Sequence, residues 1–152
     1  MWRQILAALV LSAITVAIHA TGVYAGLQWL LRSLKNRRSL SLEHAWRLTI
    51  RLVVVLLVLH SLEVAVWSQF YVALHCFSDV QTAYYFSLVT YTTLGYGDVL
   101  LPRQWRFLGG WEAMVGVFMF GWSTASLVSF IHHVIGARIK YVLPPMEGGD
   151  SD

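Results

Sequence analysis

Three long apolar segments constrain the fold of this 152-residue chain more than any other feature of its sequence. They run from Ile5 to Leu31, from Leu48 to Leu74 and from Phe107 to Ile135. At a rise of about 1.5 Å per residue, each segment is long enough to cross roughly 30 Å of hydrocarbon as a helix. The sequence has 57% hydrophobic and only 12% charged residues, a composition that excludes a water-soluble domain. We therefore predict an all-α membrane protein with three transmembrane helices.

A shorter apolar and aromatic run, residues 79–91, lies between the second and third segments. It is too short to span a bilayer, and Ser78 or Asp79 can cap its N-terminus, so we expect a re-entrant helix. The predicted order is an N-terminal transmembrane helix (1–31), a basic loop (32–47), an outer helix (48–74), the re-entrant helix (79–91), an irregular segment (92–98), an inner helix (107–135) and a short tail (136–152) that we expect to be disordered.

Residues 1–22 also have features of a secretory signal, with Ala17 to Ala20 as a cleavage site. The apolar run continues through Leu31, however, and this favours a retained helix at the periphery of the protein.

Basic residues gather between the first two apolar segments and predict the orientation of the chain. This region carries a single acid, Glu43, and many bases: Arg32, Lys35, Arg37, Arg38, Arg47 and Arg51. Positive charge stays on the cytoplasmic side of a membrane. We therefore expect the loop and the C-terminus in the cytoplasm and the N-terminus and residues 79–98 outside. The net charge of +3 is explained by this topology, and we expect no nucleic-acid partner.

The segment Thr92-Thr93-Leu94-Gly95-Tyr96-Gly97-Asp98 has the spacing of a backbone that aims successive carbonyl groups at one axis. Such a backbone alternates between ordinary and left-handed dihedral angles, which glycine adopts at little steric cost. Gly95 and Gly97 supply these positions. A ring of such carbonyl oxygens replaces the hydration shell of a cation, and about four chains are needed to close the ring. Taken alone, Gly-Tyr-Gly would indicate only a turn, but the re-entrant helix before it favours the cation site.

This segment resembles the potassium-channel signature, from which it differs by Leu94 in place of valine. The segment from Gly116 to Leu127 is similar to the inner helix of the small bacterial tetrameric potassium channels, in which a hinge glycine precedes a Phe-Gly-x-x-Thr-Ala-x-Leu run. The resemblance covers about residues 78–131. It implies a homotetramer in a cell membrane, of the bacterial inner-membrane type, that conducts K⁺ through a filter. The implied K⁺ ligands are Thr93, Leu94, Gly95 and Tyr96, with Gly97 completing the filter and Asp98 at its outer mouth.

The same resemblance implies a cavity on the inner helix, with Gly116 at the hinge and Val117, Phe120, Thr124 and Val128 facing the axis. Gly116, Gly121, Ser123 and Ser126 are also small residues that allow helices to pack closely, and the two interpretations can hold on different faces of the helix. The chain departs from the family behind the filter. Val89 stands where the family has a glutamate, and Tyr85 stands where it has a tryptophan. The Tyr85 hydroxyl could reach Asp98, and Glu112 on the inner helix is a candidate to replace the missing glutamate as a brace. Tyr85, Val89 and Glu112 are thus the residues that we expect to support the filter.

A second acid, Glu63, lies within a predicted span and follows His60 by one helical turn. This pair is either a proton sensor or a buried structural pair, and Glu112 is open to the same two interpretations. A metal site formed by His19, His60 and Glu63 would require two helices to meet at one depth, which nothing in the spacing demands. The single cysteine, Cys76, is expected to be a free thiol rather than an intersubunit disulfide.

The sequence contains no spacing of side chains that indicates an enzyme, and we expect no cofactor other than the permeant K⁺. Arg47 and Arg51 stop at the edge of the second span, so a voltage sensor is not expected, and the tail is too short for a ligand-binding domain. The partners we expect are other copies of the chain, membrane lipid and K⁺. Two alternatives stay open: a cation channel without selectivity, and an accessory membrane subunit that does not conduct.

Overall fold

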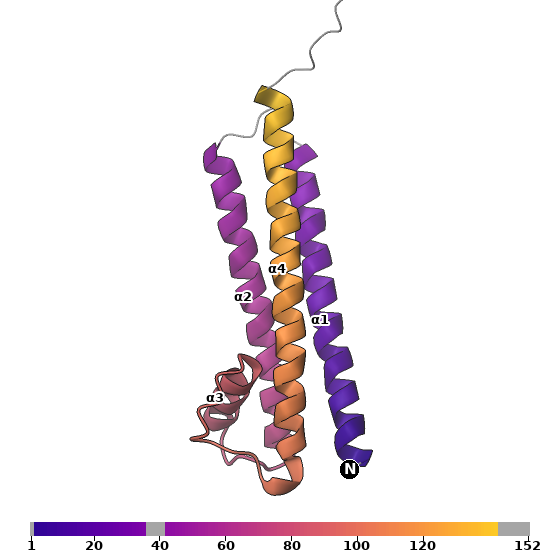
Figure 1. The fold of residues 1–152 in the computed structure, drawn as a ribbon, viewed down its shortest axis with the longest axis vertical. Coiled ribbons are helices and arrows are strands. Elements are labelled where there is room, and N and C mark those ends of the chain that lie inside the picture. The colour runs from indigo at the N-terminus through magenta and orange to yellow at the C-terminus, as the bar shows by residue number, and fades with distance from the viewer. Residues whose placement is uncertain (1, 36–41, 143–152) are drawn as a thin grey trace, which may run out of the picture.

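Three long helices lie side by side in the computed structural model, which describes residues 2–35 and 42–142 (Figure 1). They are α1 (Trp2–Lys35), α2 (Leu42–Ala73) and α4 (Arg106–Val142). A short helix, α3 (Val80–Tyr91), packs against α2 and α4 at the end of the bundle where α1 begins. A single 3₁₀ turn, η1 (Arg103–Trp105), leads into α4. The described residues contain no β-strand, so the predicted all-α fold is confirmed.

The long helices have the length and apolar composition of membrane spans, over Trp2–Trp29, Glu43–Ala73 and Arg103–Gly136. Helices α1 and α4 extend beyond their predicted apolar segments at both ends, whereas α2 begins before its segment, at Leu42, and ends at Ala73, one residue before the predicted end. Hydropathy marks the part of a helix that crosses hydrocarbon, whereas the backbone continues as a helix into the polar interface. Residues 36–41 of the predicted basic loop, including Arg37 and Arg38, and residues 143–152 of the predicted tail lie outside the described residues.

A single apolar core joins all four helices in the half of the bundle that holds α3. Its largest buried side chains, Trp67 and Tyr71 of α2, are fully inaccessible. The remaining members come from α1, α3, α4 and the segment before α4: Ala8, Leu11, Val64, Phe86, Tyr91, Leu101, Leu108, Val115 and Met119. Since α1 contributes to this core and packs against both α2 and α4, it is an integral part of the bundle.

Hydrogen bonds between side chains fix α1 against its neighbours. The indole N–H of Trp67 donates to Thr15 Oγ1 at 3.1 Å, and that of Trp111 donates to Ser12 Oγ at 2.9 Å. Further along, Gly22 lies directly against the Leu59 side chain, with no room for a Cβ. These contacts hold α1 at a defined rotation, with His19 turned toward α2.

Candidate functional site

The helix α3 is held at its start by a side-chain cap. Asp79 Oδ1 accepts a hydrogen bond from the Thr82 backbone N–H at 2.7 Å, so Asp79 rather than Ser78 is the capping residue. These bonds hold the pKa of Asp79 below its usual range. The helix ends at Tyr91, and the chain then leaves helical geometry. The irregular segment 92–98 is thereby attached to a helix that packs against two others.

The backbone of this segment alternates in the way the glycine spacing predicts. Gly95 has φ 54° and Gly97 has φ 77°, both in the left-handed region. Thr93 shares this conformation, with φ 62°, although it is β-branched. A non-glycine residue held there stores about 1–3 kcal/mol of strain. The sequence analysis expected left-handed residues only at Gly95 and Gly97 and missed this conformation at Thr93, because threonine gives no signal for it. Only the two-residue period from Gly95 and Gly97 extends to Thr93.

Amide groups of the segment form hydrogen bonds within the chain, whereas its carbonyl groups form none with the described residues. Amides at its start bond to carbonyls near the end of α3: Thr93 N–H to Thr90 at 2.9 Å, and Gly95 N–H to Val89 at 3.2 Å. Among the residues that the structure describes, no group donates a hydrogen bond to the carbonyls of residues 93–97. The segment is therefore attached to α3 by hydrogen bonds from its amides, and its carbonyl oxygens are left without a donor among the described residues. Val89, predicted to support the filter, contributes its carbonyl to this attachment.

At the outer end of the segment, the Tyr85 hydroxyl donates a hydrogen bond of 2.6 Å to Asp98 Oδ2. This bond favours the ionised carboxylate and lowers the pKa of Asp98 below its usual range. It correspondingly raises the pKa of Tyr85. The predicted contact between these two side chains is thus present in the structure.

Glu112 of α4 is fully buried between α2 and α3. It accepts a hydrogen bond from the Tyr71 hydroxyl at 2.7 Å and a second one from Ser87 Oγ. Ser87 lies in the middle of α3, so Glu112 holds the re-entrant helix from behind. Within the described residues it has no hydrogen bond to segment 92–98, and the predicted brace therefore acts on α3.

Gly116 of α4 lies directly against the last residue of α3. A Cβ at this position would overlap the Tyr91 carbonyl oxygen, so only glycine allows this approach. The structure separates Gly116 from the other residues predicted to face a cavity. Gly116 is buried against α3, whereas the others are exposed on the single chain: Val117, Phe120, Thr124 and Val128.

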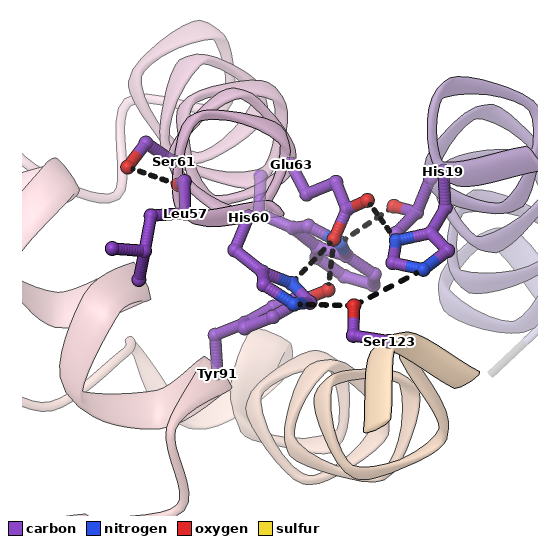
Figure 2. Close-up of polar contacts among 9 residues, drawn as sticks. His19, Leu57, His60, Ser61, Glu63, Tyr91 and Ser123 are labelled. Atoms are coloured by element: carbon purple, nitrogen blue, oxygen red, sulfur yellow. Dashed lines mark hydrogen bonds and ion pairs between the residues drawn. The ribbon is translucent and has the colours of Figure 1, made fainter. Parts of the chain in front are cut away.

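A second polar site lies between α1, α2 and α4, where the Glu63 carboxylate contacts the imidazoles of His19 and His60 (Figure 2). His19 Nδ1 lies 2.8 Å from Glu63 Oε1, and His60 Nδ1 lies 3.2 Å from Glu63 Oε2. The Tyr91 hydroxyl donates to Oε2, and Ser123 Oγ lies between the two histidine Nε2 atoms, at 3.0 Å from His60 and 3.3 Å from His19. Sequence spacing paired His60 with Glu63 but could not show that His19, Tyr91 and Ser123 join them.

The ligand-type atoms of His19, His60 and Glu63 lie within 4.8 Å of one another, a spacing that admits a metal ion. Two ligands on one tetrahedral zinc ion are about 3.3 Å apart, given metal–ligand bonds near 2.0 Å. The 2.8 Å separation of His19 and Glu63 is instead a charge-assisted hydrogen bond. Every buried side-chain nitrogen and oxygen in the described residues has a hydrogen-bond partner, so hydrogen bonds alone account for this cluster.

Comparison with known proteins gives one match. A family model described as an ion channel matches residues 52–133, more than half of the chain, from α2 through α3 and segment 92–98 into α4. No curated protein and no solved structure matches the chain.

The contact at Gly116 predicts a sharp difference between two glycines of α4. Gly116→Ala should destabilise the fold by about 1–3 kcal/mol, because the new methyl group meets the Tyr91 backbone, which cannot turn away as a side chain can. Gly110→Ala is the matched control. It has open space around its Cβ position and should be neutral or stabilising. Thermal unfolding in detergent measures both, and equal melting temperatures would contradict the close approach.

The contact at the outer end predicts a change in titration. In Tyr85→Phe, the pKa of Asp98 should rise toward that of an ordinary aspartate, because the bond from Tyr85 is the main cause of its lowering. In the native chain this bond contributes fully above the ordinary pKa and is lost as the pH falls through the lowered pKa. The Asp98 carboxyl carbon, followed by NMR against pH, reports the shift. Tyr84→Phe on the same helix should leave the titration unchanged.

Proposed function

Since this chain belongs to the ion channel family, we propose that it is a potassium-selective channel, and that four copies surround one axis to form the pore. The observation that carries this proposal is the backbone of segment 92–98. Left-handed residues at every second position, with carbonyls that lack protein donors, are what a ring of cation ligands requires. We assign K⁺ coordination to Thr93, Leu94, Gly95 and Tyr96, with Gly97 completing the filter.

Assembly of four chains follows from the number of ligands. One chain offers one row of carbonyls, and a dehydrated K⁺ ion needs a ring of them at each level. A homotetramer with a closed four-fold axis provides these rings with identical contacts between neighbours. The exposure of Leu94 and Tyr96 on the single chain supports this assembly, because large apolar side chains beside an ion path need cover from a neighbouring subunit.

The inner part of the pore is assigned to α4. Its exposed residues recur at spacings of three and four, which places Val117, Phe120, Thr124 and Val128 along one side of the helix. In the proposed tetramer this side faces a water-filled cavity below the filter. Asp98 lies at the other mouth, where its ionised carboxylate attracts cations before they enter.

The selectivity of the filter is tested at Gly97. Gly97→Ala has no neighbouring atom within 4 Å of its Cβ in the chain, so it acts through the left-handed φ alone. We expect the preference for K⁺ over Na⁺ to fall by roughly tenfold or more, as strain of about 1–3 kcal/mol is relieved by rearrangement. Flux into proteoliposomes, with barium as a blocker, measures the preference. The tetramer should still form, as shown by crosslinking.

Gly110→Ala is the control and should retain the native preference. An unchanged preference in Gly97→Ala would show that these residues do not line the ion path. Flux of Na⁺ equal to that of K⁺ in the native protein would favour a channel without selectivity, and absence of flux in every lipid would favour an accessory subunit.

We also propose that the end of the bundle holding α3 faces the outside. The start of α1 and segment 92–98 share this end, and α1 ends and α2 begins at the opposite end (Figure 1). The basic residues in the sequence between and around these two helix ends favour the cytoplasm.

The orientation is tested by cysteine labelling in a Cys76→Ser background, which removes the only native thiol. A cysteine at Gln104 should react with a membrane-impermeant reagent from outside intact cells. A cysteine at Ser39, a position outside the described residues, should react only after the cells are opened. Labelling of both from outside would contradict the three-span topology.

A further inference from the structure

The cluster around Glu63 connects every helix of the chain through buried side chains (Figure 2). α1 supplies His19, α2 supplies His60 and Glu63, α3 supplies Tyr91 and α4 supplies Ser123. These side chains make five hydrogen-bonded contacts with one another. Figure 2 shows Glu63 between the two imidazole rings, with Ser123 closing the ring of contacts from the α4 side.

Each of these contacts requires one hydrogen, and the number of hydrogens decides the protonation of the cluster. Tyr91 and Ser123 provide one each, because a hydroxyl has a single hydrogen to donate. Ser123 can therefore donate to only one of the two Nε2 atoms that face it. The other three hydrogens must reside on His19, His60 and Glu63. Two neutral imidazoles and an ionised carboxylate carry only two. Filling all five contacts with hydrogen bonds at once therefore takes a third.

The net charge of the cluster also favours three hydrogens on His19, His60 and Glu63. With two hydrogens on the imidazoles and an ionised Glu63, the cluster would carry one uncompensated negative charge inside the membrane, which is costly. Among the described residues, the ion-pair partners of Glu63 are His19 and His60. The two imidazole rings pack against each other, and the other rings beside them carry no charge: Trp122 beside His19, and Phe120 and Tyr91 beside His60. A third hydrogen makes the cluster neutral overall.

We propose that His19, His60 and Glu63 form a buried binding site for one proton, held in addition to the hydrogens of two neutral imidazoles. The inference does not depend on which ion the channel conducts. α1 creates the site, because His19 adds two contacts but only one hydrogen. Without His19, the three other contacts are satisfied by Tyr91, Ser123 and a neutral His60.

The position of Tyr91 links this proton to the filter. Tyr91 is the last residue of α3, its hydroxyl donates to Glu63, and its carbonyl packs on Gly116. When the extra proton leaves, the carboxylate becomes uncompensated and one of the five contacts is lost. Tyr91, two residues before Thr93, then donates to a carboxylate in a cluster of different net charge, so its position depends on the proton.

The proton is detected by ¹⁵N NMR of histidine in the full-length protein in lipid bilayers, because the shifts of Nδ1 and Nε2 distinguish which nitrogen carries hydrogen. At pH 7 we expect one of His19 and His60 to carry hydrogen on Nε2, in addition to the hydrogens on the Glu63 side. Ser123→Ala removes both contacts on the Nε2 side, one of which uses this hydrogen, while the charge that favours the proton remains, so the Nε2 signal should be lost at a lower pH than in the native protein. Ser126→Ala, on the same helix and outside the cluster, should retain it.

Glu63→Gln gives a second, independent test. The side-chain amide supplies one hydrogen itself, so all five contacts can be satisfied with both histidines neutral. The dependence of the melting temperature on pH should therefore be smaller than in the native protein by the release of one proton, while the cluster keeps its shape. Should this variant fail to fold, the comparison of Ser123→Ala with Ser126→Ala still decides the question.

Two results would overturn the proposal. One is a native protein in which both rings carry hydrogen only on Nδ1 at pH 7, since the third hydrogen would then be absent. The other is a shift of both Nδ1 signals on addition of zinc to chelator-treated protein, which would make the cluster a metal site. An Nε2 signal that persists to the same pH in Ser123→Ala as in the native protein would likewise contradict the hydrogen count.

Discussion

The hydrocarbon of a membrane offers no hydrogen-bond partner, and this constraint organises the whole molecule. Three helices satisfy their own backbones, and irregular backbone is confined to places where the protein supplies donors and acceptors. Segment 92–98 depends on this arrangement. Its amides bond to carbonyls at the end of α3, which leaves its own carbonyls as the part of the backbone that a cation can satisfy. The need to satisfy every backbone group inside a membrane thus explains both the helices and the free carbonyls of segment 92–98, where we propose that the ion binds.

The same constraint explains why the buried acids come with partners. Glu112 is matched by the hydroxyls of Tyr71 and Ser87, and Glu63 by two histidines and Tyr91. Both carboxylates bond to residues of α3, one in its middle and one at its end. The re-entrant helix is too short to be held by apolar packing along a full span, and these polar contacts give it a fixed position against α2 and α4.

The sequence predicted those features that depend on local chemistry. Apolar length predicted the spans, and the glycine spacing predicted the left-handed residues at Gly95 and Gly97. It failed where two helices must be rotated against each other. His19 lies 44 residues before Glu63, and no periodicity within α1 shows that it faces α2 rather than lipid. Close packing at Gly116 was one of two interpretations of that residue, but its partner, Tyr91, could not be predicted for the same reason, since a glycine that allows close packing and one that allows bending look alike in a sequence.

The approach of Gly116 to Tyr91 has a mechanical consequence. It joins α4 to Tyr91, the residue directly before segment 92–98, through main-chain atoms, which cannot change rotamer as a side chain can. Glu112, one turn earlier, ties the same stretch of α4 to the middle of α3. This part of α4 is therefore fixed to α3 at two points, Gly116 and Glu112. In the channel we propose, displacement of this part of α4 also displaces the end of α3 and the start of segment 92–98, which couples the inner and outer ends of the ion path.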